Sequence, residues 1–126
     1  MKALSIIASA YRATVEEQDD TIVWLSHAMK GAGASVDVVL RGNAVNYAVR
    51  GQDAGGLEFG RWKQTEPARI EHAVAGLIAK GVTVFALSED LEERGLAGAE
   101  LLDGVEPIGM HALAELLPRY ERVWHW

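Results

Sequence analysis

The chain has 126 residues, of which 49% are apolar and 24% charged, a composition that suits one globular domain and argues against disorder. Its formal net charge of −6 disfavours nucleic acid as a partner, because that binding depends on basic groups that neutralise phosphates. The sequence contains no cysteine, which excludes disulfides, thiolate metal sites and thiol nucleophiles.

The sequence shows neither a secretory signal nor an apolar run of about 18 residues, the length that a transmembrane helix needs. We therefore expect one soluble, cytoplasmic domain over residues 1–126 that makes no membrane contact. The four histidines are scattered and form no recognised zinc pattern, so no metal or cofactor is predicted. They are His27, His72, His111 and His125.

The first third of the chain predicts a strand, a loop and a long helix. Residues 2–10 (KALSIIASA) read as a buried strand, and residues 9–14 as its exit loop. Residues 14–17 (TVEE) fit a capping box, in which Thr and Glu satisfy free N–H groups at a helix start. Apolar residues then recur at helical spacing up to glycines that end the helix: Ile22, Leu25, Met29, Ala32, Gly31 and Gly33.

The middle third predicts a strand over residues 35–40 (SVDVVL) and a break at 41–43. A short helix over 44–50 and a glycine-rich loop over 51–65 follow. Pro67 favours a helix start, and the apolar face of that helix is formed by Ile70, Val74, Leu77 and Ile78.

The last third opens with the clearest strand, residues 82–87 (VTVFAL), which is rich in β-branched and aromatic side chains. A short acidic helix is predicted over 88–93, another over 97–102, and a strand over 105–108. A helix over 110–117 is stopped by Pro118, and residues 122–126 can form a last strand.

Strands that alternate with helices predict an α/β fold, with a mostly parallel sheet of about five strands flanked by helices in flavodoxin-like layers. Ligands of such sheets bind at the carboxyl ends of the strands. The loops at residues 9–14, 41–45 and 88–94 are therefore the candidate site loops.

The preferred site combines Ser88, Glu89 and Asp90 with Arg94, because two carboxylates and a hydroxyl at a strand end can bind a cation or polar ligand. The structural alternative makes Ser88 an N-cap, the acids partners of the helix dipole, and Arg94 an ion-pair partner of one of them.

Two further loops contribute candidates. Ser9, Tyr11 and Arg12 can hold an anion, although an exposed loop with Tyr11 in a subunit contact is the favoured explanation. Asn43 follows the second strand, where asparagine commonly serves as a turn residue.

Residues 55–62 (GGLEFGRW) approach a phosphate-binding loop but lack the Lys and Ser or Thr that must follow its last glycine. A mobile flap or an oligomer contact better explains Phe59 and Trp62. Trp124 and Trp126 share one face of the final strand, and either an interface or internal packing can bury them.

The order of these segments resembles the DsrE/DsrF family, with its TusD and YchN branches, over essentially the whole chain. The segments that carry the resemblance are KALSIIASA with its helix, RGNAVNYAV, VTVFAL followed by Arg94-Gly95-Leu96, and LLDGVEPIGMHALAELL. The resemblance implies trimers or hexamers, mixed assemblies with related subunits, and a role near sulfur trafficking.

Sulfur-carrying members of that family place a cysteine at positions that match Leu87 and Asp90 here. A persulfide forms on a thiolate, and neither of these side chains provides one. The leading hypothesis is therefore a non-catalytic, cysteine-free member that acts by assembly. The alternatives are a module that binds a small ligand at the strand ends, and an enzyme with Asp90, Glu89 or His111 as acid or base.

Overall fold

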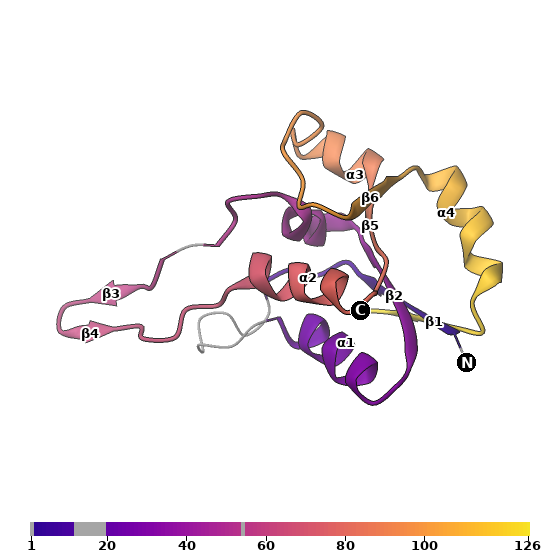
Figure 1. Cartoon of the computed structure of the whole chain (residues 1–126). Helices are drawn as coiled ribbons and strands as arrows, with labels where there is room; N and C mark the ends of the chain where they lie inside the picture. Colours follow the sequence, from indigo (N-terminus) through magenta and orange to yellow (C-terminus); the bar gives the residue numbers. More distant parts are fainter. Residues whose placement is uncertain (1, 12–19, 54) are drawn as a thin grey trace.

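The computed structural model describes residues 2–11, 20–53 and 55–126. Five strands form one parallel sheet in the order β6-β5-β2-β1-β7, which confirms the predicted fold class (Figure 1). The strands are β1 (Lys2–Ile7), β2 (Ser35–Leu40), β5 (Val84–Leu87), β6 (Val105–Ile108) and β7 (Arg122–His125).

Helices cover both faces of this sheet. Helices α1 (Thr21–Gly31) and α2 (Ile70–Ala79) pack on the face that carries Ala3, Val38 and Val84. Helix α4 (Met110–Leu116) packs on the opposite face through Leu113. Because both faces are covered, the central strands β1 and β2 read as almost continuous apolar runs.

The return of the chain from β6 to β7 places the last strand beside the first. Strand β7 pairs with β1 in the register Ala3↔Arg122 to Ile6↔His125. Trp124 packs against the core cluster on the α1 and α2 face. The indole of Trp126 donates to the hydroxyl of Ser5 at 3.1 Å, although the Trp126 side chain remains partly exposed.

The carboxyl edge of the sheet is built around a short 3-10 helix, η2 (Gly42–Ala48), which follows β2 directly. Four of its residues are buried, and it packs against α2, α3 (Ser88–Glu93), β2 and β5. The predicted helix over 44–50 is therefore shifted toward the N-terminus and wound more tightly. The predicted strand at 35–40 and helix at 88–93 have the expected bounds.

The glycine-rich segment is not a plain loop, as the sequence predicted, but a hairpin. Strands β3 (Glu58–Phe59) and β4 (Trp62–Lys63) pair antiparallel across a two-residue turn. Gly60 has φ +59 in this turn, a conformation that glycine adopts without steric cost. Figure 1 shows this hairpin, hereafter the arm (residues 55–65), extending well beyond the sheet and its helices.

Residues 97–102 form turns and a β-bridge, so the predicted short helix there is wrong. Leu102 N donates to Ala48 O at 2.8 Å, and Arg50 N donates to Glu100 O at 2.9 Å. These long-range backbone bonds hold the segment extended against the end of η2. Local sequence preference cannot reveal such pairing.

Several element ends also differ from expectation. Strand β1 ends at Ile7 rather than Ala10, and α2 begins at Ile70 rather than at Pro67. The capping box at 14–17 lies outside the described residues, and α1 begins at Thr21 with Asp20 as its N-cap. No helix in the described part of the chain is long and apolar enough to cross a membrane.

Candidate functional site

Asp90 joins two of the predicted site loops. Its Oδ2 accepts a hydrogen bond from Gly42 N at 2.5 Å, which fixes α3 to the start of η2. Gly42 has φ +54, and a Cβ there would lie 3.1 Å from the carbonyl oxygen of Ala8. The ends of β1, β2 and β5 therefore meet at Gly42, where any other residue would strain the backbone.

Arg94 and Asn43 meet beside this contact. The Nε and Nη2 atoms of Arg94 both donate to Asn43 Oδ1, at 3.1 and 3.0 Å. Arg94 Nη1 also donates to the main-chain oxygen of Asp90 at 3.3 Å. Three predicted residues from two loops, 41–45 and 88–94, thus form one cluster, in which the guanidinium bonds to groups of the chain itself.

Ser88 and Glu89 face other surroundings. Leu87 occupies the N-cap position of α3 and Ser88 is the first helical residue, so the N-cap interpretation of Ser88 is not what the structure shows. Ser88 lines a hollow of about 230 Å³ with apolar neighbours that include Leu91, Leu96 and Pro107. Glu89 instead accepts hydrogen bonds from Met110 N at 3.0 and 3.1 Å, which ties α3 to α4.

The loop after β1 contributes Ser9 and Tyr11, whereas Arg12 lies outside the described residues. Ser9 is exposed, and its N–H donates to Trp126 O at 3.4 Å. Tyr11 adopts φ 58, and its N–H donates to the hydroxyl of Tyr47. The two rings meet edge to face at 5.2 Å. Burial, then the nearby Asp53 carboxylate, raises the pKa of Tyr11.

Tyr47 and Asp20 form a buried pair that the sequence reading missed. The Tyr47 hydroxyl donates to Asp20 Oδ2 at 2.7 Å, and Asp20 Oδ1 accepts from Ile22 N and Val23 N at 2.9 and 3.1 Å. Burial, then the hydrogen bond to Asp20, raises the pKa of Tyr47. The aspartate before a helical run was a readable N-cap signal, but nothing local marks Tyr47 as its partner.

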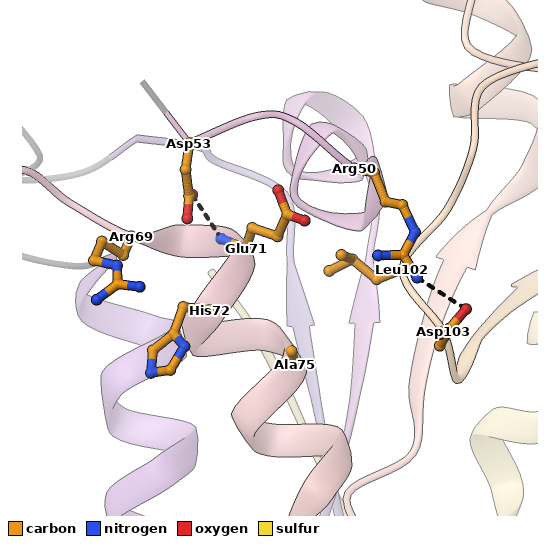
Figure 2. A pocket seen from close by; sticks show the side chains of 8 residues that line it. All are labelled: Arg50, Asp53, Arg69, Glu71, His72, Ala75, Leu102 and Asp103. Atoms are coloured by element: carbon orange, nitrogen blue, oxygen red, sulfur yellow. Dashed lines mark hydrogen bonds and ion pairs between the residues drawn. The ribbon is translucent and has the colours of Figure 1, made fainter. Parts of the chain in front are cut away.

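A polar hollow of about 410 Å³ opens beside the start of α2 (Figure 2). Its lining includes the cations Arg50 and Arg69 and the acids Asp53, Glu71 and Asp103. Several of these charges already have partners. Arg50 pairs with Asp103 at 2.9 Å, Asp53 accepts from Glu71 N at 2.8 Å, and Glu71 accepts from Gly51 N at 2.8 Å. Because the lining carries both positive and negative side chains, the hollow favours neither an anionic nor a cationic ligand.

The remaining ionisable candidates form no metal-binding cluster in the described part of the chain. In the described ranges, no three histidine or acidic side chains converge on a point where a metal ion could bind. The exposed His111 pairs with Glu115 at 3.5 Å on its own helix. The geometry therefore defines a parallel α/β protein in which the strand-end residues Asn43, Asp90 and Arg94 bond within and between the loops after β2 and β5.

The sequence model of the DsrE/DsrF-like family matches residues 3–125 of this chain. The chain therefore belongs to the DsrE/DsrF-like family, which confirms the resemblance seen in the sequence. No match was found among curated protein sequences.

Solved structures show the same fold at low sequence identity. The ychN protein from E. coli is 21% identical, with a TM-score of 0.68 and coverage of 100% of both chains. The protein MTH1491 from Methanobacterium thermoautotrophicum is 16% identical, with a TM-score of 0.70 over 99% of this chain and 98% of the other. BT1422 from Bacteroides thetaiotaomicron is 16% identical, with a TM-score of 0.68 and coverage of 99% and 95%.

Proposed function

We propose that this chain is a non-catalytic DsrE/DsrF-like protein that acts by assembly, with copies of itself or with related subunits, in the context of sulfur metabolism. The proposal rests on the residues at positions 87 and 90, which match the family's sulfur-carrying cysteine and are Leu87 and Asp90 in this chain. Leu87 is fully buried in the core under α4. Asp90 is bonded to the backbone of Gly42. Both residues support the fold.

The chemistry of sulfur transfer supports the same proposal. A relay protein carries sulfane sulfur as a persulfide, which forms when a thiolate attacks the donor and accepts its outer sulfur. The chain has no cysteine that could do so. Methionine does not replace it, because a thioether has no proton to lose and forms no transferable persulfide.

The assembly part of the proposal is supported by the arm, which exposes two aromatic rings. The side chains of Phe59 and Trp62 are 67% and 48% exposed, and their rings lie 5.8 Å apart. Aromatic side chains are enriched where protein surfaces associate. A two-stranded hairpin is also only marginally stable alone in water, so a covering surface would stabilise it.

Native mass spectrometry on the purified chain tests this proposal. We expect a trimer or hexamer with no added mass. The chain should also gain no sulfur after incubation with a persulfide donor, while a cysteine-containing carrier protein treated in parallel gains one sulfur atom. A monomer at micromolar concentration, or a stable sulfur adduct on this chain, would contradict the proposal.

The hollow beside Ser88 favours a second candidate function, the binding of a small molecule. At about 230 Å³ it accommodates only a compact, largely apolar group, which the Ser88 hydroxyl could orient. A molecule retained in the native mass spectrum would support this function, provided that Leu96→Trp, which fills the hollow, abolishes its retention. An unmodified mass for the parent chain would count against it.

A further inference from the structure

A shallow groove with a volume of about 400 Å³ runs between α1 and α2, which pack side by side on one face of the sheet (Figure 1). The residues that line it are Trp24, His27, His72, Ala73, Gly76 and Lys80. None of these six residues lines the hollow beside Ser88, so the groove is a separate candidate site. Its volume falls within the range of pockets that bind small molecules.

The groove offers a flat apolar surface. The Trp24 side chain is 62% exposed, so its indole is uncovered. On the α2 side the lining residues Ala73 and Gly76 are small. Gly76 also permits the close approach of the two helices, because a Cβ there would lie 3.1 Å from His27 Cε1. An uncovered indole beside small residues suits an aromatic ring, which can stack on it.

A chain of hydrogen bonds holds one cation in the groove. His27 Nε2 donates to Ala73 O at 2.7 Å, so Nδ1 of the neutral imidazole accepts from Lys80 Nζ at 3.0 Å. Lys80 is the C-cap residue of α2, and these bonds draw its ammonium group back along the helix toward Ala73. An ammonium group has three N–H donors and His27 engages one of them, so the others can donate to a ligand.

The charge of the groove selects an anion. The described residues that line it include the Lys80 ammonium group and two imidazoles but no acidic side chain. Helices α1 and α2 together contain one acid, Glu71, whose carboxylate accepts from Gly51 N and lines the separate polar hollow. Because the whole chain has a formal net charge of −6, a groove lined without an acid is a local property and does not follow from composition.

We infer that this groove binds a small aromatic carboxylate, with the ring stacked on the indole of Trp24 and the carboxylate accepting from Lys80 Nζ. A ligand of this class needs a flat apolar surface and a cationic donor, and the groove presents both. A neutral ring lacks the contact with Lys80, and a cationic ring is repelled by it. The inference goes beyond the assembly function proposed above, which does not depend on it.

An NMR titration of the isotope-labelled chain with three ligands that share one ring tests the site. Indole-3-acetate carries a carboxylate, indole-3-acetamide is neutral, and tryptamine carries an ammonium group. The chemical shifts give the dissociation constant of each ligand and locate its site through the Gly76 amide and the Trp24 indole N–H. The titration is repeated on Trp24→Ala and on Lys80→Met. Lys30→Met is the matched control, because it removes one positive charge from α1 outside the groove lining.

We expect indole-3-acetate to bind with a dissociation constant on the order of 1 mM or below, at least about threefold more tightly than the amide, and tryptamine to bind most weakly. Lys80→Met should abolish the preference for the carboxylate, Lys30→Met should retain it, and Trp24→Ala should weaken the binding of all three ligands.

Equal affinities for the three ligands in the parent chain would overturn the site. So would an unchanged preference in Lys80→Met, an unchanged affinity in Trp24→Ala, or shifts that leave Trp24 and Gly76 unaffected. An absence of binding by indole-3-acetate at about 10 mM would overturn it as well. Each of these outcomes would leave the proposed assembly intact, since the oligomeric state is measured separately.

Discussion

The carboxylate of Asp37 on β2 accepts a hydrogen bond from the hydroxyl of Tyr120, which lies just before β7, at 2.7 Å. The same carboxylate accepts from Thr83 N at 3.0 Å and pairs with Lys2 Nζ at 3.2 Å. One largely buried acid thus connects β2 to the segments that lead into β5 and β7. These contacts lie at the amino edge of the sheet, opposite the candidate site.

The pKa of Asp37 predicts a loss of stability in acid. Burial alone would raise this pKa, but the hydrogen bonds from Tyr120, Thr83 and Lys2 outweigh burial and lower it below the ordinary value of 3.8. Because the folded pKa lies below the unfolded one, Asp37 stabilises the fold above about pH 4, and that contribution is lost as the pH falls further. Urea unfolding of the parent and of Asp37→Asn from pH 7 to pH 3 measures it.

The parent should be more stable than Asp37→Asn by about 1–3 kcal/mol at pH 7, with a gap that narrows toward pH 3. A stability difference that stayed constant with pH would mean that the charge of the Asp37 carboxylate does not contribute.

The Tyr120 hydroxyl makes the stability depend on alkaline pH instead, because burial and Asp37 raise its pKa. Its contribution is present below about pH 10 and is lost as the pH rises above that value.

Removal of the Tyr47 hydroxyl should destabilise the chain. That hydroxyl donates to the buried Asp20 and accepts from Tyr11 N, so Tyr47→Phe leaves the buried Asp20 carboxylate and the part-buried Tyr11 N–H with one partner fewer. We expect a loss of about 1–3 kcal/mol in the free energy of unfolding, measured in urea. Tyr11→Phe is the matched control. It removes a hydroxyl from a more exposed side chain, whose contacts include Gln52 Oε1 at 3.4 Å, and it should cost less than Tyr47→Phe.

Gly104 should tolerate no side chain. It has φ +92, and a Cβ there would lie 2.7 Å from Ile78 Cγ2 on α2. Gly104→Ala should therefore lower the thermal midpoint markedly, at a cost of roughly 2 kcal/mol from backbone strain and overpacking. Gly98→Ala is the control, because nothing lies within 4 Å of its Cβ position. Equal midpoints for the two variants would disprove the proposed close approach of α2.

Asp90 should contribute to stability rather than to binding. Asp90→Ala removes the acceptor of the Gly42 N–H and should cost about 1–2 kcal/mol, with no change in the number of assembled copies. Glu93→Ala serves as the control, because Glu93 is exposed and lies 3.7 Å from Arg94. An Asp90→Ala variant as stable as the parent that loses a bound molecule would instead favour the ligand-binding function.

Much of the fold was predictable because its signals are local. The apolar run at 35–40 and the acidic helix at 88–93 have the expected bounds, since each element is marked by its own composition. The hairpin at 58–63 was missed because its strands are two residues long and exposed, so they show no alternation of buried and exposed residues. The helix expected at 97–102 is wrong because residues 97–99 turn and backbone bonds to Ala48 and Arg50 hold residues 100–102 extended.

The sequence indicated which candidate residues lie near one another, but not which hydrogen bonds they make. Parallel topology places Asn43, from the loop after β2, beside Asp90 and Arg94, from the segment after β5. Which group each side chain bonds depends on distances between those loops, so the contact of Glu89 with α4 could not be read in advance. The Asp20–Tyr47 pair joins residues 27 positions apart, and only the folded chain shows that connection.

The pairing of β7 with β1 has a consequence for how the chain is made. Strand β1 leaves the ribosome well before its outer neighbour, which is built from residues 122–125. Until those residues emerge, one edge of an apolar strand has no ladder partner, and such edges recruit strands of other chains. A nascent chain that stalled before Arg122 would therefore be prone to aggregation, and a chaperone that shields this edge should raise the yield of folded protein.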